Sequence, residues 1–218
     1  MKSIKIAIDG PSGAGKSTVA KELAKRLEID YVDTGAMYRA AAYKLIKSKV
    51  AYGDLNAVVD MLNKTEIDFS QGNIILDGEI INDKIRTQEI SGFASQISAI
   101  SEVRNILVAL QRKMGSEKSI IMDGRDIGTV VLKDAEYKFF VTASLEERAK
   151  RRYLELKDKG IETDLETVKR EIKDRDIKDT TREVTPLVMA GDATLIDGTG
   201  LSVSETVDLI LKKMNMSI

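Results

Sequence analysis

The sequence predicts an α/β fold in which a central parallel sheet of five strands lies between helices. Short apolar strands alternate with amphipathic helices along most of the chain, which is typical of a parallel sheet. Short alternating runs at residues 65–83 interrupt this order and predict a small antiparallel insertion. Two strongly charged helices separated by Gly160 predict a helical lid. Because 218 residues suit one main core, we expect a single domain over residues 1–218.

Apolar periodicity predicts the elements in order. Residues 2–9 alternate isoleucine with other side chains before a Gly-Pro pair, which predicts a buried first strand. A helix follows from Lys16, and a second strand within 29–35 leads to a helix over 36–49 with Thr34 as its expected cap. An insertion is expected at about 55–88, with turns at 71–73 and 77–78. Helices at 87–100 and 102–115 and strands at 119–126 and 137–143 should follow. The last expected elements are a helix opened by a capping box of Ser144 and Glu147, a helix at 162–179, a strand at 193–200 and a helix at 202–214.

Composition restricts the chemistry open to the chain. It has 34 Lys and Arg against 35 Asp and Glu, a net charge of -1, and no Cys or His. These absences exclude disulfides, thiolate nucleophiles, Ser-His-Asp catalysis and the usual zinc sites, whereas phosphoryl transfer needs mainly positioning and charge neutralisation. The balanced charge, the lack of a long apolar run and the lack of a leader pattern predict a cytoplasmic protein without nucleic-acid or membrane partners. A monomer is the default expectation.

A phosphate-binding loop is the strongest motif in the sequence. The segment GPSGAGKS fits the pattern G-x-x-x-x-G-K-[ST] at every fixed position, after an apolar strand and before an amphipathic helix. Glycines allow backbone N–H groups to point inward at an anion, and the helix adds its own free amides. Lys16 is expected along the β- and γ-phosphates of ATP and the Ser17 hydroxyl on magnesium. The residues expected at the ATP phosphates are Gly10, Pro11, Ser12, Gly13, Ala14, Gly15, Lys16, Ser17 and Thr18.

A second apolar strand ends in the segment DGRD, residues 123–126. The C-terminal ends of strands line the ligand crevice of an open parallel sheet, so this segment is expected to face the phosphate loop. Asp123 is the candidate that supports the magnesium shell, either directly or through water. An exposed turn with a surface salt bridge is the alternative interpretation of the same residues.

Several arginines are candidates for holding a second phosphate, because guanidinium groups contact phosphate through paired hydrogen bonds. The charged helix has a simpler interpretation, since the spacing of Glu147 and Arg151 is also typical of a solvated surface. Closing the two charged helices as a lid would exclude water and protect ATP from hydrolysis. The residues by themselves predict a kinase of a small molecule and leave the acceptor open. The candidates are Arg39, Arg125, Arg175 and Arg182, with Arg148, Arg151 and Arg152 on the charged helix.

Sequence blocks along the whole chain resemble bacterial cytidylate kinase (CMP kinase), of the nucleoside monophosphate (NMP) kinase group of P-loop proteins. The blocks are IDGPSGAGK, DTGAMYR, IRTQEIS, ASQIS with EVR, MDGRDIGTVV, ERAKRR, EIKDRD, PLVMAGDA and IDGTGLSV, in this order. The resemblance implies a P-loop NTPase fold of three layers, α/β/α, and phosphoryl transfer from ATP with Mg2+ to CMP or dCMP. It also implies a core at about 1–34, 89–147 and 183–218, an NMP-binding region at about 35–88 and a lid at about 148–182.

The resemblance implies a role for each matching residue. Ser95, Arg104 and Asp126 would read the cytosine edge, which offers an amine donor and acceptors at N3 and O2. The implied CMP-binding residues are Thr34, Arg39, Ser95, Arg104, Arg125, Asp126, Arg175, Asp179 and Arg182, with Asp179 on the sugar hydroxyls. The implied catalytic residues are Lys16, Asp123, Arg125 and Arg175, the metal residues are Ser17 and Asp123, and Arg151 and Arg152 would reach the ATP phosphates from the lid.

The sequence departs from the family pattern at two positions, and two other functions are alternatives to the one that the resemblance implies. Thr34 stands where Ser is common and Lys178 where some relatives carry Arg, so both bear on the preference between ribose and deoxyribose. A kinase for UMP, AMP or shikimate would share the phosphate loop, but the insertion and the proposed base-reading set argue against it. A GTP-dependent switch protein would carry an Asn-Lys-x-Asp motif, and the nearest match, at 63–66, ends in Glu.

Overall fold

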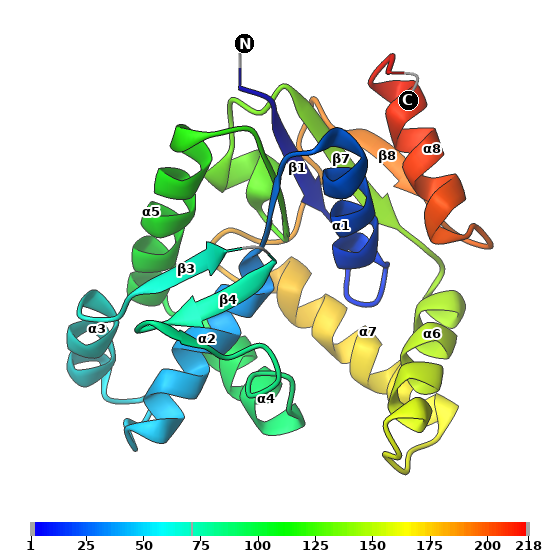
Figure 1. Ribbon diagram of the computed structural model, residues 1–218. Helices are drawn as coiled ribbons and strands as arrows, with labels where there is room; N and C mark the ends of the chain where they lie inside the picture. Colours follow the sequence, from blue (N-terminus) through cyan, green and yellow to red (C-terminus); the bar gives the residue numbers. More distant parts are fainter. Residues whose placement is uncertain (1–2, 71, 217–218) are drawn as a thin grey trace. The chain divides into compact units, whose positions relative to one another are not determined.

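The structure of the protein is a computed structural model, which describes residues 3–70 and 72–216. Its elements follow the alternating order expected from the sequence (Figure 1). They are β1 (Lys5–Asp9), α1 (Lys16–Leu27), β2 (Asp30–Asp33), α2 (Thr34–Lys47), α3 (Leu55–Asn63), β3 (Ile67–Ser70), β4 (Asn73–Leu76), β5 (Glu79–Ile80), α4 (Gln88–Ile97), α5 (Ser101–Glu117), β6 (Ile120–Gly124), the π-helix η1 (Ile127–Val131), β7 (Tyr137–Thr142), α6 (Leu145–Asp158), α7 (Leu165–Thr181), β8 (Thr194–Asp197) and α8 (Val203–Lys213).

The larger sheet has five strands in the order β2-β6-β1-β7-β8. Strand β1 pairs in parallel with both β6 and β7, and β7 pairs in parallel with β8. The smaller sheet is antiparallel and has the order β3-β4-β5. The predicted fold class, a central parallel five-stranded sheet with helices on both sides and a small antiparallel sheet, is therefore confirmed.

The described residues form two compact units. The first contains the chain up to Tyr31 and again from Ser119 onward, and the second contains Val32 to Lys118. Helices α4 and α5 belong to the second unit because α4 packs on α2 and α5 on α3. Residues 89–147, which the sequence predicts to be part of the core, are thus divided between the two units at Lys118. The predicted lid belongs wholly to the first unit.

In the first unit, the sheet packs on α1 and α8. Ile8 of β1, Leu23 of α1 and Ile210 of α8 are fully buried in one apolar cluster, and Figure 1 shows both helices on the same side of the strands. Strand β6 is buried along its whole length, as expected of the continuous apolar run of an interior parallel strand. This packing fixes the register of β1 against β6, in which Ile8 lies opposite Asp123.

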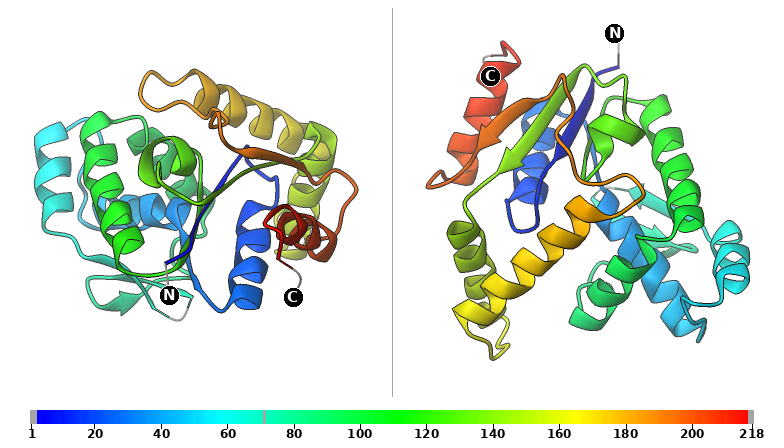
Figure 2. Two further views of the ribbon diagram at one scale, coloured as in Figure 1. Left: turned by 90° about the horizontal axis from the view of Figure 1, so that it is seen from above. Right: turned by 180° about the vertical axis from the view of Figure 1, so that it is seen from behind.

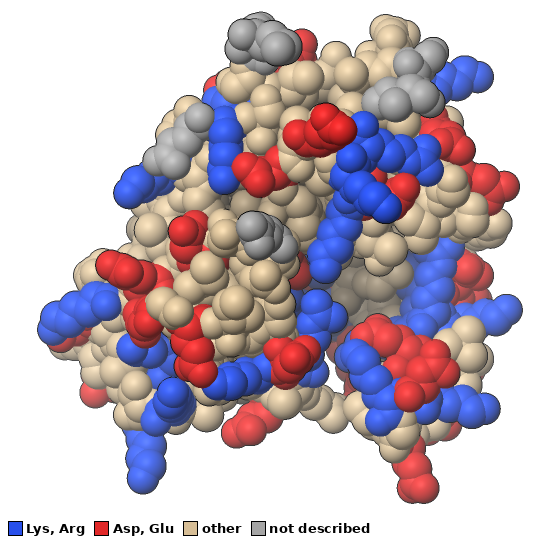
Figure 3. Space-filling view, in the orientation of Figure 1, with Lys and Arg blue, Asp and Glu red and all other residues tan. Residues whose placement is uncertain are grey.

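Helices α6 and α7 form a second, smaller apolar contact. They pack on each other through Ala149, Val168 and Ile172. Figure 2 shows the two helices side by side. Positive and negative side chains are interspersed over the face seen in Figure 3, including the part that α6 and α7 form. Among residues 3–70 and 72–216, no helix has both the length and the apolar character needed to cross a membrane.

The second unit contains the predicted insertion. Asp77 and Gly78 have φ of 49° and 82° and separate the paired residues Leu76 and Glu79, which is the geometry of a two-residue hairpin turn. The other predicted turn, at 71–73, includes Gln71, which lies outside the described residues. Helix α3 was not predicted, although a short amphipathic pattern follows Asp54 and the Asp54 side chain accepts a hydrogen bond from Ala57 N.

The predicted cap of α2 is wrong by one residue. Asp33 is the cap, because its backbone is extended and its Oδ1 accepts a hydrogen bond from Ala36 N at 2.8 Å. Thr34 is the first helical residue and is 4% exposed. The second carboxylate oxygen of Asp33 accepts from Arg39 Nη2 at 2.9 Å, so one side chain both starts the helix and holds an arginine.

The predicted capping box of α6 is only half formed. Ser144 accepts from Glu147 N at 3.2 Å, but the Glu147 carboxylate accepts from Arg151 instead of reaching back to the cap. The reciprocal box occurs at the start of α8, between Ser202 and Glu205. The Ser144 N–H donates instead to Thr199 Oγ1 at 2.9 Å, while Glu147 accepts a charge-assisted hydrogen bond from Arg151.

We expect Asp33→Ala to destabilise the protein, because α2 then loses its cap and Arg39 its partner. The free energy of unfolding should fall by about 1 kcal/mol or more. Asp33→Asn is the matched control, since its amide oxygen still accepts from Ala36 N, and it should cost less. Urea denaturation measures both variants, and equal losses would contradict the capping role.

Candidate active site

The predicted phosphate loop connects β1 to α1, and its glycines are required by its geometry. Gly10, Gly13 and Gly15 have φ of 145°, 74° and 84°, which side chains other than glycine rarely adopt. A Cβ on Gly10 would lie 2.0 Å from the carbonyl oxygen of Val141, so no other residue fits there. Gly15 is the residue before α1 and gives that helix no side-chain cap, which leaves its first amides for another acceptor.

Lys16 is folded back onto its own loop. It is 5% exposed, and its Nζ donates to the carbonyl of Pro11 at 2.7 Å. Burial and, to a smaller extent, the charge of Arg125 lower the pKa of the Lys16 ammonium to about 7, although Asp123 and Asp9 oppose the shift. A bound polyphosphate would reverse this balance, because its negative charge favours the protonated amine.

A hydroxyl and a carboxylate meet beside the loop. Ser17 Oγ donates to Asp123 Oδ2 at 2.9 Å, and the Tyr31 hydroxyl donates to the other oxygen, Oδ1, at 2.6 Å. Asp123 is 4% exposed near the C-terminal end of β6, as predicted from the strand pattern. Oxygen atoms of this kind are the ligands that Mg2+ prefers, so the pair fits a site for that ion. Tyr31 was not predicted, because an isolated tyrosine carries no motif.

Asp9 is a second buried acid, and no motif in the sequence marks it. It is 4% exposed, and its two oxygens accept from the backbone N–H groups of Ile127 and Gly128, each at 2.8 Å. Burial raises the pKa of Asp9 to about 6, although both hydrogen bonds oppose the shift. The π-helix η1 begins directly after Asp126, so Asp9 fixes the segment that carries this 6%-exposed residue. π-Helical turns are often found at functional sites.

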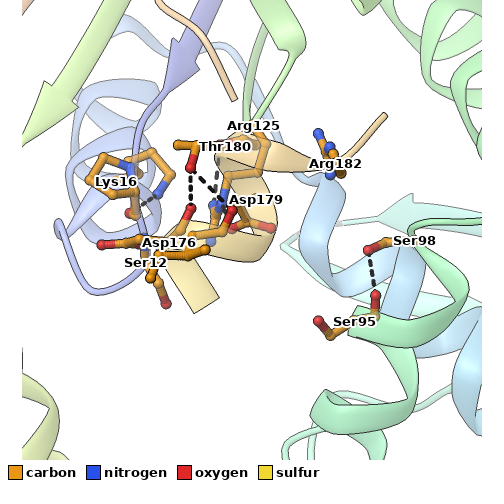
Figure 4. A network of polar contacts seen from close by, with 12 residues as sticks. Ser12, Lys16, Ser95, Ser98, Arg125, Asp176, Asp179, Thr180 and Arg182 are labelled. Atoms are coloured by element: carbon orange, nitrogen blue, oxygen red, sulfur yellow. Dashed lines mark hydrogen bonds and ion pairs between the residues drawn. The ribbon is translucent and has the colours of Figure 1, made fainter. Parts of the chain in front are cut away.

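Asp179 of α7 is surrounded by arginines. Arg125 Nε donates to Asp179 Oδ2 at 2.7 Å (Figure 4). Burial favours the neutral acid, but the charges of Arg125, Arg175 and Arg182 outweigh it and hold the pKa of Asp179 below its ordinary value. Arg182 in turn donates Nε to the carbonyl of Thr185 at 2.6 Å. Three of the four arginines predicted to bind a second phosphate are therefore neighbours of one carboxylate.

The remaining predicted acceptor residues lie in the second unit. Arg104 is 2% exposed and donates Nη1 to the carbonyl of Ser98 at 3.0 Å. Ser98 Oγ donates to the carbonyl of Ser95 at 2.8 Å, so Ser98, which was not predicted, connects the two predicted residues (Figure 4). Thr34 and Arg39 lie together in the first turns of α2.

The two predicted lid arginines differ in their surroundings. Arg151 donates to the carbonyls of Gly198 and Leu201 at 3.0 and 3.4 Å, and its Nη1 lies 3.6 Å from where a Cβ on Gly15 would be. Arg152 pairs with Glu155 at 2.8 Å and is 43% exposed, which matches the solvated interpretation of this helix. Of these two arginines, Arg151 is the one that lies beside the phosphate loop.

Comparison with known proteins decides the family. A family model described as cytidylate kinase matches residues 6–216. A cytidylate kinase from Clostridioides difficile (strain 630) is 50% identical over 99% of this chain and 100% of that protein. One from Caldicellulosiruptor saccharolyticus is 49% identical over 97% of this chain and 96% of that protein. The chain belongs to the cytidylate kinase family.

Solved structures share the fold of this cytidylate kinase family member at low identity. An uncharacterized protein from Eubacterium ventriosum aligns with a TM-score of 0.55 at 17% identity, covering 98% of this chain and 99% of that one. Shikimate kinase from Bacteroides thetaiotaomicron aligns with a TM-score of 0.50 at 9% identity, covering 98% and 99%. This likeness concerns the fold alone.

We expect ATP binding by this cytidylate kinase family member to take up a proton above pH 7. Lys16 is largely neutral at pH 8 in the free protein, since its pKa is about 7, and the phosphates favour the charged form. The affinity should therefore fall as the pH rises from about 7 to 9. Calorimetry of Mg-ATP binding at pH 8, in two buffers of different ionisation enthalpy, measures the uptake.

Lys25→Ala, at an exposed lysine of the same helix, is the control and should leave the uptake unchanged. Binding heats that do not depend on the buffer would contradict a neutral Lys16 in the free protein.

Proposed function

We propose that the protein transfers the γ-phosphoryl group of ATP to CMP or dCMP, giving ADP and CDP or dCDP. Family membership over residues 6–216 supports the reaction class and the acceptor. The observation that carries the proposal is the pairing, within one unit, of a phosphate loop with an arginine cluster around Asp179. Such a unit has cationic groups for two phosphates, which a simple ATP hydrolase does not need.

The donor side consists of the loop from Gly10 to Thr18. The amides from Gly13 onward and Lys16 are proposed to hold the phosphates of ATP, with the ammonium moving from Pro11 to the β- and γ-phosphates. Ser17 and Asp123 are proposed to hold Mg2+, which would neutralise charge on the transferred group. Within residues 3–70 and 72–216 no cluster of three acidic side chains is placed to bind a metal, so phosphate oxygens would complete its shell.

The acceptor side uses arginines that the protein now pairs internally. Arg125 is held by Asp179, Arg39 by Asp33 and Arg182 by the carbonyl of Thr185. We propose that the CMP phosphate replaces these contacts and that Arg175 joins them, while Asp179 turns to the sugar hydroxyls. The exchange keeps Arg39, Arg125 and Arg182 hydrogen-bonded before and after binding, so these three cations would not lose their partners.

The base is proposed to be read by Ser95, Arg104 and Asp126. The Asp126 carboxylate would accept from the exocyclic amine of cytosine, and Arg104 and Ser95 would donate to N3 and O2. Uracil offers a carbonyl and an N–H at the first two positions. It would therefore leave buried polar groups mismatched, and a site built on hydrogen bonds rejects such an analogue strongly.

The transfer step needs little covalent help from the protein. An oxygen of the CMP phosphate forms a new bond to the γ-phosphorus as the bond to the β-γ bridging oxygen breaks, and ADP leaves with that oxygen. Lys16, Arg125 and Arg175 are proposed to neutralise the transferred group and to keep the two phosphates in line. Arg151, beside Gly15, is proposed to reach the ATP phosphates from the lid, and Arg152 would follow on closure.

A panel of acceptors tests the proposal. ADP formation is measured with ATP and Mg2+ and with CMP, dCMP, UMP, AMP, GMP, shikimate or no acceptor. Turnover with CMP and dCMP well above UMP, and almost none without an acceptor, is expected. Preference for another acceptor would keep the kinase and reject the base-reading set, and hydrolysis without any acceptor would reject both. Gel filtration in the same buffer checks the proposed monomer.

We expect Asp126→Asn to reduce the preference for CMP over UMP, because an amide both donates and accepts. The ratio of kcat/KM for the two substrates should fall by about tenfold or more. The KM for ATP, which is bound by other residues, should change little. An unchanged CMP to UMP ratio in a folded variant would remove Asp126 from the base-reading set.

A further inference from the structure

One residue of the phosphate loop is held by two side chains of the lid helices. Ser12 donates its backbone N–H to Asp176 Oδ1 at 3.2 Å, and its carbonyl accepts from Arg148 Nη1 at 2.9 Å. Arg148 Nη1 also donates to Asp176 Oδ2 at 2.5 Å, which closes a ring through the three residues. Figure 4 shows Asp176 of α7 beside Ser12 and near Lys16. We call Arg148 and Asp176 the Ser12 clamp.

The clamp is anchored deep in the first unit. The Arg148 side chain is 8% exposed, and its Nε donates to the carbonyl of Ala143, directly after β7. Gly13, the next residue of the loop, lies so close to α6 that a Cβ on it would be 3.3 Å from Arg148 Cβ. The shape of the loop therefore depends on the first turn of α6 and on the C-terminal part of α7.

The clamp places a carboxylate next to a loop that binds anions. By itself, Asp176 would repel the phosphates of ATP, and its effect would be large in a partly buried position. Arg148 neutralises that charge and donates to the Ser12 carbonyl at the same time. The pair can thus orient both backbone groups of Ser12 without adding net charge to the loop.

We propose that Arg148 and Asp176 are positioning residues for the donor nucleotide. They fix Ser12 with its N–H directed at α7, so that the amides from Gly13 onward point into the anion site. The proposal rests on the proposed function only in taking the loop as the site of the ATP phosphates. Neither residue touches ATP, and both act through Ser12. Removing one member leaves a buried charge, so the two should behave as a unit.

Three variants and one control test the clamp: Arg148→Met, Asp176→Asn, the double variant, and Arg26→Met. Arg26 pairs with Asp208 at the same distance of 2.5 Å, but at the far end of α1. We expect Arg148→Met to raise the KM for ATP by about tenfold or more and the KM for CMP by less than about twofold. Asp176→Asn should have a smaller effect in the same direction, and Arg26→Met should leave both constants unchanged.

The double variant gives the sharpest readout. Its KM for ATP should rise by less than the product of the two single effects, because it leaves no bare carboxylate beside the loop. Equal rises in the KM for ATP and for CMP, multiplicative single effects, or unchanged constants in folded variants would each overturn the proposal. If a thermal melt shows that Arg148→Met does not fold, Asp176→Asn and Arg148→Lys test the proposal instead. The same comparison applies, in which the KM for ATP rises and the KM for CMP changes little.

Calorimetry separates the clamp from the proposed function. Mg-ATP binding is measured directly in the wild type and in Asp176→Asn, without any acceptor. Weaker binding in the variant supports the clamp even if CMP is not a substrate, whereas equal binding overturns the clamp even if CMP is phosphorylated.

Discussion

The close approach of Gly10 to Val141 is the constraint on which the rest of the site depends. The loop can leave β1 and pass over β7 only because Gly10 has no Cβ, and one built there would lie 2.0 Å from a backbone oxygen. The turn delivers Lys16 and Ser17 to the C-terminal end of β6, where Asp123 meets Ser17. Strands β1 and β6 are held in register by the buried core between the sheet and the helices α1 and α8.

Most of the cationic groups proposed to bind phosphate are held by partners within the protein. Arg39 and Arg125 are held by carboxylates, Arg182 by the carbonyl of Thr185, and Lys16 by the carbonyl of Pro11. Burying several cations without such partners would be costly, while exchanging one anionic partner for another costs little. The free protein therefore keeps its arginine cluster around Asp179 assembled, and binding needs mainly a change of partner.

Strand β1 links the two halves of the chemistry through consecutive residues. Asp9 holds the start of η1, next to Asp126, and Gly10 begins the phosphate loop. A shift of β1 would thus displace the segment proposed for the base and the loop proposed for ATP together. The clamp on Ser12 connects the start of α6 and the C-terminal part of α7 to that same loop. Among the described contacts, none of this kind holds the opposite ends of the two helices, around Gly160.

The sequence by itself determined the fold class, the phosphate loop and the position of Asp123, because each follows from a local pattern of apolar periodicity or glycine spacing. Local patterns failed where a contact between distant residues decides the outcome. The cap of α2 moved to Asp33, whose second oxygen also holds Arg39, and Glu147 turned from its cap to Arg151. The contacts of Asp9 and Tyr31, and those between the clamp and Ser12, were not predicted, since they join residues about 90 to 165 positions apart that carry no spacing signal. Only the tertiary structure decided which of the many charged residues are buried, because burial and pairing depend on how the sheet brings distant segments together.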